Sequence, residues 1–489
     1  MISASLKEIS EVKKVALFYG HAASNKGDLA INSGLASILA REFPNALFYI
    51  CFLDVKNKTY LEAAQESFGA VAGRCRFIQI QKSFVGASID VQCAVRWLRT
   101  WIPHDPDIVL VNSGEFFFSY TGFSNFESLF WRFLPCLAAG GLQIPVAIPP
   151  SSFGPFEDGV SIALLRAVSN AFGLNARELS SERYLNRLDI RARLFRDPAF
   201  ECPILNALPI EQRGQDRFVG LIPRLEYWGI RQEQRLAKEV HRKHKSAGFR
   251  SSVAFCVYRD IIEALLASPA SVRVILLAQT LADRDLCAAI ASAFREDGRV
   301  YMEYPVTYSE FLSSVSSCSH IITSRFHSAI FGLSLGKDVY GVHFPQHGNK
   351  LVGLFDSFQL GNRVFTIDSV SDSPQIDVSS FFEGNGPEVP RCGPGAFCIG
   401  EGSLLASNSS LDRLALCLEA VWRIAKFQLN GGDMRILSSF VSDYFFLPLS
   451  RRSNRAWPFN NDLRSVLYAI EPISDEVLSN ANRIARRVV

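Results

Sequence analysis

Short apolar runs alternate with helix-length segments along the first 150 residues. Four of these runs are predicted to be buried strands: residues 15–19 (VALFY), 46–53 (ALFYICFL), 107–111 (DIVLV) and 145–148 (PVAI). After the first run, apolar residues recur at helical spacing from Ile31 to Leu39. Strands that are apolar throughout and separated by helices are typical of a parallel sheet covered on both faces. The first half is therefore predicted to be a doubly wound α/β domain.

The same alternation returns after residue 217. Residues 197–216 are rich in proline and polar residues, which is typical of a connection between domains. Further strand-like runs follow at 217–223 (RFVGLIP), 272–278 (VRVILLA), 299–304 (RVYMEY), 320–324 (HIITS) and 338–342 (DVYGV). We expect two Rossmann-like domains, residues 1–205 and 206–369. Residues 370–489 are expected to form an irregular Gly-, Pro- and Ser-rich extension with a helix near 410–430 that packs back on the domains.

Charge and cysteine usage exclude several classes of protein. The 51 Lys and Arg against 48 Asp and Glu give a formal net charge of +3, so whole-chain charge offers no reason to expect nucleic acid binding. The 11 cysteines lack CxxC spacing, which favours buried free thiols in a reducing compartment. The first residues lack the apolar core of a signal peptide, and no run reaches the roughly 18–20 apolar residues of a membrane span. These features predict a cytoplasmic protein.

Residues 324–350 carry the strongest functional signal. Arg325 and His327 stand at the carboxyl end of a predicted strand, where a helix begins, and ligands of open α/β sheets bind at that edge. Helix N–H groups and a guanidinium suit a phosphate or carboxylate, and the imidazole two residues on can donate a proton there. A histidine at a helix start is usually structural, but the nearby arginine favours function. His343 and His347 lack a third ligand, so no metal site is predicted.

Several short motifs, taken in order, resemble those of polysaccharide pyruvyltransferases. The matching elements are residues 25–28 (NKGD), 152–156 (SFGPF), 197–200 (DPAF), 325–327 (RFH), 336–338 (GKD) and Lys350. The resemblance covers about residues 13 to 360. It rests on the order and spacing of the motifs, because none of them is specific by itself.

The resemblance implies a GT-B-like fold, similar to that of two-domain glycosyltransferases. It also implies transfer of the pyruvyl group of phosphoenolpyruvate to hydroxyls of an exopolysaccharide, another glycan or a lipid-linked sugar, as a ketal. His327 is by analogy the general acid, and Arg224, Arg325 and Lys350 are expected to hold the phosphate and carboxylate of phosphoenolpyruvate against the second domain. No cofactor is expected besides this co-substrate. A lipid-linked acceptor would place the protein at the periphery of a membrane.

Polar residues that follow the strands of the first domain are expected to face the acceptor. Asp28 is the candidate base or hydroxyl-binding residue, although its position just before a helix is equally explained by an N-cap. Asn25, Asn112 and Glu115 are placed on the same edge. Gln279, at the end of the 272–278 run, is expected to face the cleft from the other domain.

Two other functions stay open at the level of sequence. A nucleotide-sugar glycosyltransferase of the same architecture would use Arg325 and Lys350 to bind a diphosphate, but no convincing carboxylate for the ribose stands between residues 325 and 350. A non-catalytic glycan-binding or assembly protein is the third hypothesis. The presence of both Arg325 and His327 argues against it.

Overall fold

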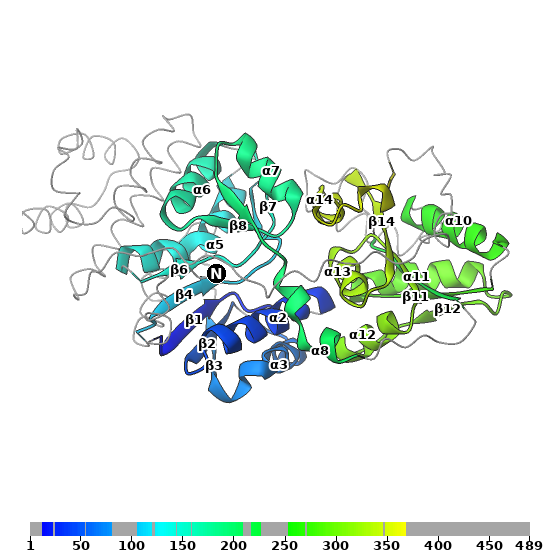
Figure 1. The fold of residues 1–489 in the computed structure, drawn as a ribbon, viewed down its shortest axis with the longest axis horizontal. Coiled ribbons are helices and arrows are strands. Elements are labelled where there is room, and N and C mark those ends of the chain that lie inside the picture. Colours follow the sequence, from blue (N-terminus) through cyan, green and yellow to red (C-terminus); the bar gives the residue numbers. More distant parts are fainter. Residues whose placement is uncertain are drawn as a thin grey trace, which may run out of the picture.

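Two open parallel sheets, each covered by helices, make up the described part of the chain (Figure 1). The computed structural model describes residues 12–22, 25–53, 55–80, 105–119, 123–142, 144–157, 159–208, 217–225, 253–268, 271–345 and 348–367. The predicted fold class, two Rossmann-like domains that face one another in a GT-B-like arrangement, is confirmed. The predicted extension, residues 370–489, and its helix lie outside the described residues.

The first sheet has the strand order β3-β2-β1-β4-β6, and all its strands are parallel. The strands are β1 (Lys14–Phe18), β2 (Leu47–Leu53), β3 (Cys75–Ile80), β4 (Ile108–Val111) and β6 (Val146–Ala147). Successive residues of β1 point to opposite faces: Val15 and Leu17 join the apolar cluster under the helix after β1, whereas Ala16 and Phe18 join the cluster on the other face. This double burial explains why the strand is apolar throughout.

Within the described residues, four helices and a 3-10 turn accompany this sheet: α2 (Lys26–Glu42), α3 (Lys58–Ser67), η1 (Gly69–Arg74), α5 (Phe123–Leu142) and α6 (Gly159–Phe172). The cluster with Val15 and Leu17 includes residues of α2 and α3, and the cluster with Ala16 and Phe18 includes residues of α5 and α6. Helices therefore cover both faces, as the doubly wound prediction requires.

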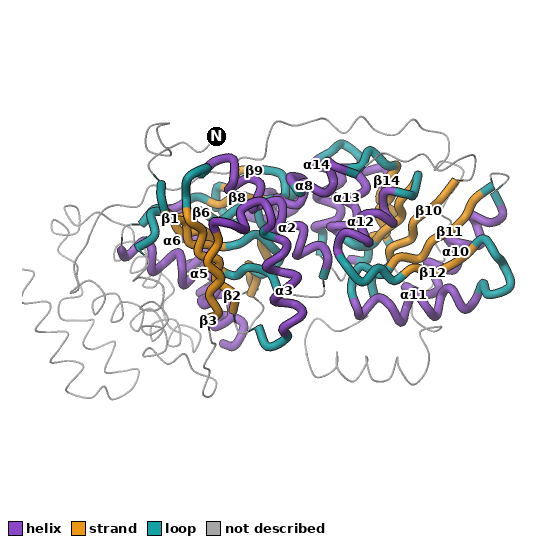
Figure 2. The backbone as a smooth tube through the Cα atoms, turned by 90° about the horizontal axis from the view of Figure 1, so that it is seen from below, coloured by secondary structure: helices purple, strands orange, loops and turns teal. Residues whose placement is uncertain are grey.

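The second sheet, which includes β10, β11, β12 and β14 in Figure 2, has the order β12-β11-β10-β13-β14-β15. Its strands are also all parallel. Its strands are β10 (Arg217–Ile222), β11 (Val272–Leu277), β12 (Val300–Glu303), β13 (His320–Thr323), β14 (Asp338–His343) and β15 (Val364–Thr366). The helices around it are α10 (Val253–Ala267), α11 (Leu281–Ala293), α12 (Tyr308–Ser316), α13 (Phe326–Ser334) and α14 (Lys350–Ser357), with the 3-10 turn η6 (Gly361–Arg363). One face packs against α10 and α11, and the other against α12 and α13.

Smaller elements connect the two sheets. They are β5 (Phe117–Ser119), β7 (Phe153–Phe156), β8 (Leu174–Ala176), α7 (Leu179–Arg187), β9 (Ala192–Leu194), η3 (Pro198–Glu201) and α8 (Pro203–Ala207). The predicted boundary between residues 205 and 206 falls inside α8, which contacts α2, α12 and α13. It stays a prediction, because α8 packs against elements of both halves.

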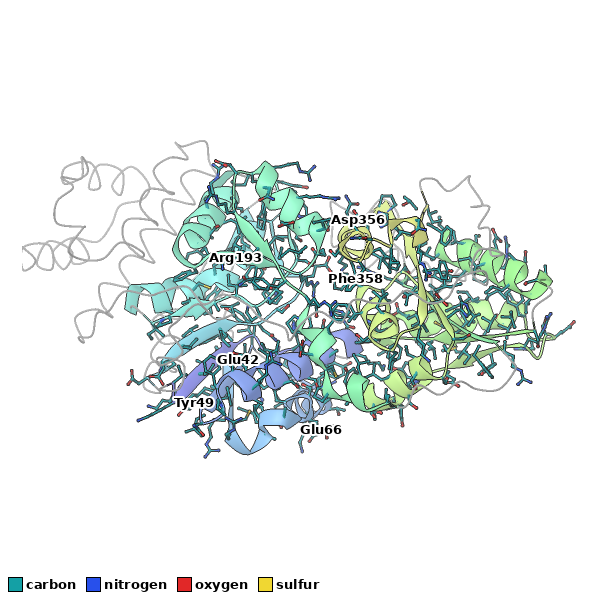
Figure 3. The ribbon with its side chains drawn as sticks, in the orientation of Figure 1. Glu42, Tyr49, Glu66, Arg193, Asp356 and Phe358 are labelled. Atoms are coloured by element: carbon teal, nitrogen blue, oxygen red, sulfur yellow. The ribbon has the colours of Figure 1, made fainter. Side chains whose placement is uncertain are left out.

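The two halves share one apolar cluster. Ala30 and Ile31 of α2 pack in it together with Phe311 and Phe326 of the second half. Nearby, α7 packs against α14, where a side chain at Gly353 would overlap Ser180. At the end of α14, Asp356 pairs with Arg183 at 3.0 Å and the Phe358 ring lies 5.4 Å from that of Phe200 (Figure 3). A shared apolar interface limits relative motion of domains.

Strand order reverses at one place in each sheet, between β1 and β4 and between β10 and β13. Ligands of open α/β sheets bind outside the carboxyl ends of the strands at such switch points. The segments that follow these four strands are residues 19–28, 112–115, 223–225 and 324–327. Most of the residues singled out from the sequence stand in these segments. Among the described helices, none is long and apolar enough to cross a membrane.

Ile31→Ala is expected to destabilise both halves together. Ile31 is fully buried in the shared cluster, and truncation of a buried isoleucine costs about 2–5 kcal/mol. Val306→Ala is the control, because Val306 is 78% exposed and surface substitutions usually stay within about 0.5 kcal/mol. Thermal and urea unfolding would measure both variants. Equal midpoints for the two variants would contradict the shared core.

Candidate functional site

His327 lies in the first turn of α13, after Arg325, which is the N-cap residue. The imidazole is almost fully buried and stacks on Phe331, with ring centroids 6.5 Å apart. Its Nε2 atom lies 3.7 Å from Oδ2 of Asp197 and has no hydrogen-bond partner among the described residues. A buried ring nitrogen without a partner, next to a carboxylate, is suited to giving and taking a proton.

The other face of His327 lies against Gly27, at the start of α2 in the first half. A methyl group at residue 27 would overlap the imidazole. The glycine of the NKGD segment is therefore explained by the close approach of two elements from different domains. This contact places His327 at the junction of the two switch points.

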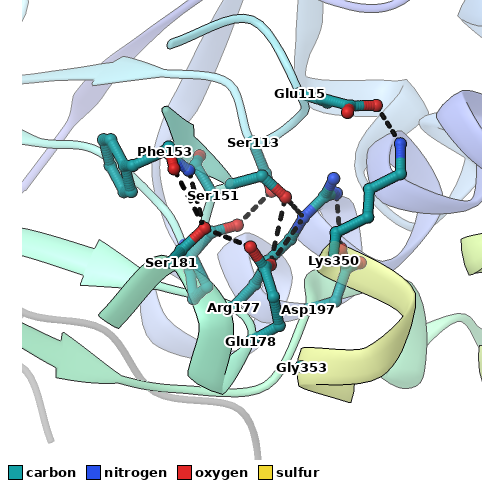
Figure 4. Close-up of polar contacts among 12 residues, drawn as sticks. Ser113, Glu115, Ser151, Phe153, Arg177, Glu178, Ser181, Asp197, Lys350 and Gly353 are labelled. Carbon is teal, nitrogen blue, oxygen red and sulfur yellow. Dashed lines mark hydrogen bonds and ion pairs between the residues drawn. The ribbon is translucent and has the colours of Figure 1, made fainter. Parts of the chain in front are cut away.

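Arg177, directly after β8, is a buried guanidinium that binds Asp197 (Figure 4), the carboxylate that also lies beside His327. Its NH1 group donates to Oδ2 of Asp197 at 2.8 Å, its Nε group donates to Oγ of Ser152 at 2.8 Å, and it lies over the Phe326 ring at 4.5 Å. Burial would raise the pKa of Asp197, but Arg177 and His327 outweigh it and hold that pKa at about 2. Asp197 is therefore charged near neutral pH.

Glu178, the next residue, is held by two serine hydroxyls. Ser152 Oγ donates to it at 3.0 Å, and Ser181 Oγ donates to its other oxygen (Figure 4). Burial raises the pKa of Glu178 to about 7, against the opposing effects of Arg177 and the two hydroxyls. Asp197 is therefore the main carboxylate that balances the charge of Arg177. The two serine hydroxyls hold the Glu178 side chain in place.

Lys350, the first residue of α14, pairs with Glu115 of the first half (Figure 4). Burial lowers the pKa of Lys350 to about 8, and the nearby Arg224 and Arg177 act in the same direction against Glu115. The Glu115 side chain is 42% exposed, and the surrounding protein opposes its ionisation, but Lys350 and Arg224 hold its pKa below the usual range. Three basic side chains therefore surround one carboxylate, and the arrangement favours an anionic ligand.

Of the three residues expected to hold the anionic donor, Lys350 and Arg224 lie in this cluster. The Arg224 charge acts on both Lys350 and Glu115. The third, Arg325, instead pairs with the fully buried Asp283 and donates to Thr280 at 3.2 Å. The Asp283 carboxylate already balances the charge of Arg325. In this conformation Arg325 stabilises the loop between β11 and α11.

Asn25 and Gln279 form a bridge between the halves. The Asn25 Oδ1 atom caps α2 by accepting from the Gly27 N–H at 3.1 Å, and it also accepts from Gln279 Nε2 at 2.7 Å. Ser328 donates to the other end of the Gln279 amide at 2.6 Å. Both side chains lie at the junction, and both are engaged with protein groups.

Asp28 and Asn112, expected on the acceptor side, lie in different settings. The N-cap interpretation of Asp28 is wrong, because Asn25 is the N-cap and Asp28 stands in the first turn. Its carboxylate forms no hydrogen bond with a described residue and acts electrostatically on His21. Asn112 has no exposed surface, and its amide donates to the Tyr19 carbonyl at 3.2 Å and to Asn32 at 3.1 Å. Here it supports the loop after β1.

The sequence interpretation missed Arg177, Glu178 and a role for Asp197. In the sequence, Asp197 is recognisable only as part of the 197–200 (DPAF) motif at the end of the first domain. The available signal was the adjacent charged pair Arg177-Glu178, directly after a short strand. Adjacent opposite charges are usually solvated, so burial could not be recognised from the pattern.

A model of the polysaccharide pyruvyl transferase family matches residues 25–342. This range is more than half of the 489 residues and includes His327, Asp197 and Arg177. The chain belongs to the polysaccharide pyruvyl transferase family. The resemblance drawn from the motifs is thereby confirmed, and membership makes the protein a transferase. A search of the curated proteins finds no match.

Solved structures with a similar arrangement are distant in sequence. UDP-GlcNAc 2-epimerase of Neisseria meningitidis, bound to UDP-GlcNAc, is 13% identical, with a TM-score of 0.41, over 67% of this chain and 82% of that one. The Methanocaldococcus jannaschii UDP-GlcNAc 2-epimerase, in complex with UDP-GlcNAc and UDP, is 12% identical, with a TM-score of 0.44, over 83% and 99%. ADP-heptose LPS heptosyltransferase II of E. coli is 12% identical, with a TM-score of 0.35, over 74% and 92%.

Gly27→Ala is expected to impair the transfer reaction without unfolding α2. Alanine favours a helix by about 1 kcal/mol over glycine, but its methyl group would displace the His327 ring. A misplacement of about 1 Å at a reacting group can lower the rate about 10²-fold. The value of kcat/KM and the thermal midpoint would be measured together. Wild-type kcat/KM in a well-folded variant would contradict the close approach.

Proposed function

We propose that the protein transfers the pyruvyl group of phosphoenolpyruvate to two hydroxyls of a glycan or lipid-linked sugar, forming a pyruvate ketal. The observation that carries this proposal is the position of His327. Its Nε2 atom lacks a hydrogen-bond partner among the described residues and lies beside Asp197, which also binds Arg177. Arg177, with Arg224 and Lys350, is one of the cations that act on Glu115. A proton donor among cations fits a donor that is anionic and must be protonated on carbon.

Phosphoenolpyruvate carries a phosphate and a carboxylate, so its binding site must supply several positive donors. Lys350 can present three N–H groups, and Arg177 and Arg224 present planar guanidinium groups. The start of α13 adds backbone N–H groups and a positive dipole end next to His327. We assign the donor to this space, with Lys350 and Arg224 on its anionic groups.

The chemistry begins with a proton transfer from His327 to the methylene carbon of phosphoenolpyruvate. Asp197, held ionised by Arg177, stabilises the protonated imidazole before the transfer. A sugar hydroxyl then bonds to the central carbon, the carbon–oxygen bond to phosphate breaks, and phosphate leaves with the electron pair. The second hydroxyl closes the ketal. Of the two hydroxyl protons, one replaces the proton given by His327, and the other leaves on hydrogen phosphate.

The acceptor is expected on the first domain, opposite the donor. Asp28 and Glu115 both follow strands at the switch point of the first sheet, and Glu115 is exposed. Carboxylates are strong acceptors for sugar hydroxyls. Asn25, Asn112 and Gln279 would then hold the loops that carry these carboxylates, through the bonds described above.

Lys350→Ala is expected to weaken binding of phosphoenolpyruvate by about 10- to 100-fold, since a hydrogen bond to a charged group contributes about 1.5–3 kcal/mol. A thermal-shift titration would measure this, because a ligand at about 100 times its Kd adds about 2.7 kcal/mol of apparent stability. Lys58→Ala, with a highly exposed side chain, is the matched control. UDP-GlcNAc is the comparison ligand. Stabilisation by UDP-GlcNAc and none by phosphoenolpyruvate would replace the proposal with a nucleotide-sugar glycosyltransferase.

The kcat/KM for phosphoenolpyruvate is expected to fall as the pH rises above about 8. Lys350 in the free protein has a pKa of about 8, so its charge is present below that pH and is lost as the pH rises through it. Lys350→Arg should abolish this decline, because an arginine stays protonated. Glu115→Gln should move the decline to lower pH, because Glu115 raises the pKa of Lys350. An unchanged profile in both variants would contradict the role of Lys350.

A further inference from the structure

His21 occupies the switch point of the first sheet, on the acceptor side of the proposed site. It follows β1 and lies beside the residues that follow β4, with its ring 6.1 Å from that of Phe116. Glu115 is the neighbour of Phe116 in the chain, and it pairs with Lys350 across the junction. The imidazole is only partly buried. It therefore lies where an acceptor hydroxyl is expected, and nothing in the motif pattern had pointed to it.

One hydrogen bond fixes which ring nitrogen of His21 carries the proton. The Nε2 atom lies 2.6 Å from the backbone carbonyl oxygen of Ser113. A carbonyl oxygen only accepts, so Nε2 must be the donor. In the neutral ring, Nδ1 then holds a lone pair. Among the described residues, none forms a hydrogen bond with Nδ1, so this nitrogen is open to a proton from outside the protein.

The backbone of His21 is clamped by buried amides. The fully buried Asn32 accepts from the His21 N–H at 3.1 Å and donates to the His21 carbonyl at 2.8 Å. Asn112 donates both to Asn32 and to the Tyr19 carbonyl. Tyr19 itself has a φ of 64°, a left-handed conformation that a non-glycine residue adopts only when its surroundings hold it. These three residues fix the backbone of His21, and the Ser113 carbonyl fixes its ring.

The charged groups around His21 come from three helices. Asp28 of α2 stabilises the protonated ring, whereas His327 of α13 and Arg132 of α5 disfavour it. Loss of contact with water in this partly buried position is the largest effect, and it lowers the pKa of His21 below its usual value against the opposing effect of Asp28. His21 is therefore neutral near neutral pH and able to accept a proton, and Asp28 is placed to stabilise the charge that results.

We propose that Nδ1 of His21 accepts the proton of the sugar hydroxyl that attacks phosphoenolpyruvate, a role that rests on the pyruvyl transfer proposed above. As the hydroxyl oxygen bonds to the central carbon, its proton passes to Nδ1 of His21 and then leaves on hydrogen phosphate. His327 supplies the proton that the methylene carbon gains and regains one from the second hydroxyl. No oxidation or reduction is involved. Two histidines, one from each domain, then serve as base and acid on opposite reactants.

The tautomer of His21 can be tested without any sugar acceptor. In protein with ¹⁵N-labelled histidine, the signals of His21 would be identified from those missing in His21→Gln. We expect a proton on Nε2 and a bare Nδ1 at pH 7, with protonation only below the pH at which an ordinary histidine titrates. A proton on Nδ1, or a protonated ring at pH 7, would overturn the proposal whichever acceptor is used.

Turnover tests the catalytic role. The amide of His21→Gln can still donate to Ser113 but cannot accept a proton, so we expect kcat to fall about 10²- to 10⁴-fold, the usual contribution of a general base. Phosphate release from phosphoenolpyruvate would be followed with methyl glycosides of hexoses and N-acetylhexosamines. His320→Gln, at the amino end of β13 and away from the site, is the control. We expect wild-type activity to decline at acidic pH, because His21 becomes protonated there. This decline should be absent in His21→Gln.

The outcomes separate this inference from the proposed function. If His21→Gln has unchanged turnover and the wild type forms the ketal normally, the role of His21 as base is wrong and the proposed function is unaffected. Loss of the thermal shift with phosphoenolpyruvate in His21→Gln would also overturn the assignment, because it would make His21 a donor-binding residue. If the wild type shows no thermal shift with phosphoenolpyruvate and forms no ketal, the proposed function is wrong, and so is the role of His21 that rests on it.

Discussion

The buried pair of Arg177 and Asp197 is the interaction on which the rest of the site depends. Asp197 accepts from Arg177, caps η3 by accepting from the Ala199 N–H at 2.7 Å, and lies 3.7 Å from His327. Taking two charges out of water is costly, and only good geometry with further hydrogen bonds offsets that cost. Ser152, Glu178 and the face of Phe326 supply these contacts to Arg177. One carboxylate therefore organises a guanidinium, an imidazole and a chain turn at once.

The second constraint is the close approach of the two domains. Gly27 admits His327, Asn25 bonds to Gln279, and Glu115 pairs with Lys350, so each contact joins an element of the first half to one of the second. The shared apolar cluster holds these polar contacts in register. Because the switch points of both sheets meet there, a donor bound by one domain and an acceptor bound by the other would be brought together. This arrangement suits a transfer between two substrates, in which orientation supplies much of the rate.

Much of this fold could be predicted from the sequence, because strands buried on both faces are apolar throughout and helices show their own period. His327 and Lys350 could also be placed, since the ends of adjacent parallel strands must meet at one edge. The hydrogen-bond and ion-pair partners of the polar side chains could not be predicted. Arg325 pairs with Asp283, and Asn112 bonds to Tyr19 and Asn32, through contacts that only the packed chain creates. Arg177 was missed because β8 and β9 are three-residue strands with no readable period, and His21 because a single imidazole in a loop carries no pattern.

The most direct test of the central claim is a crystal structure of the protein with phosphoenolpyruvate. We expect the anionic groups of the ligand against Lys350 and the neighbouring guanidinium groups, and the methylene carbon about 3–3.5 Å from Nε2 of His327, as a reacting pair requires. Phosphoenolpyruvate bound elsewhere, or with its methylene carbon turned away from His327, would contradict the assignment of His327 as the acid and of the domain junction as the active site.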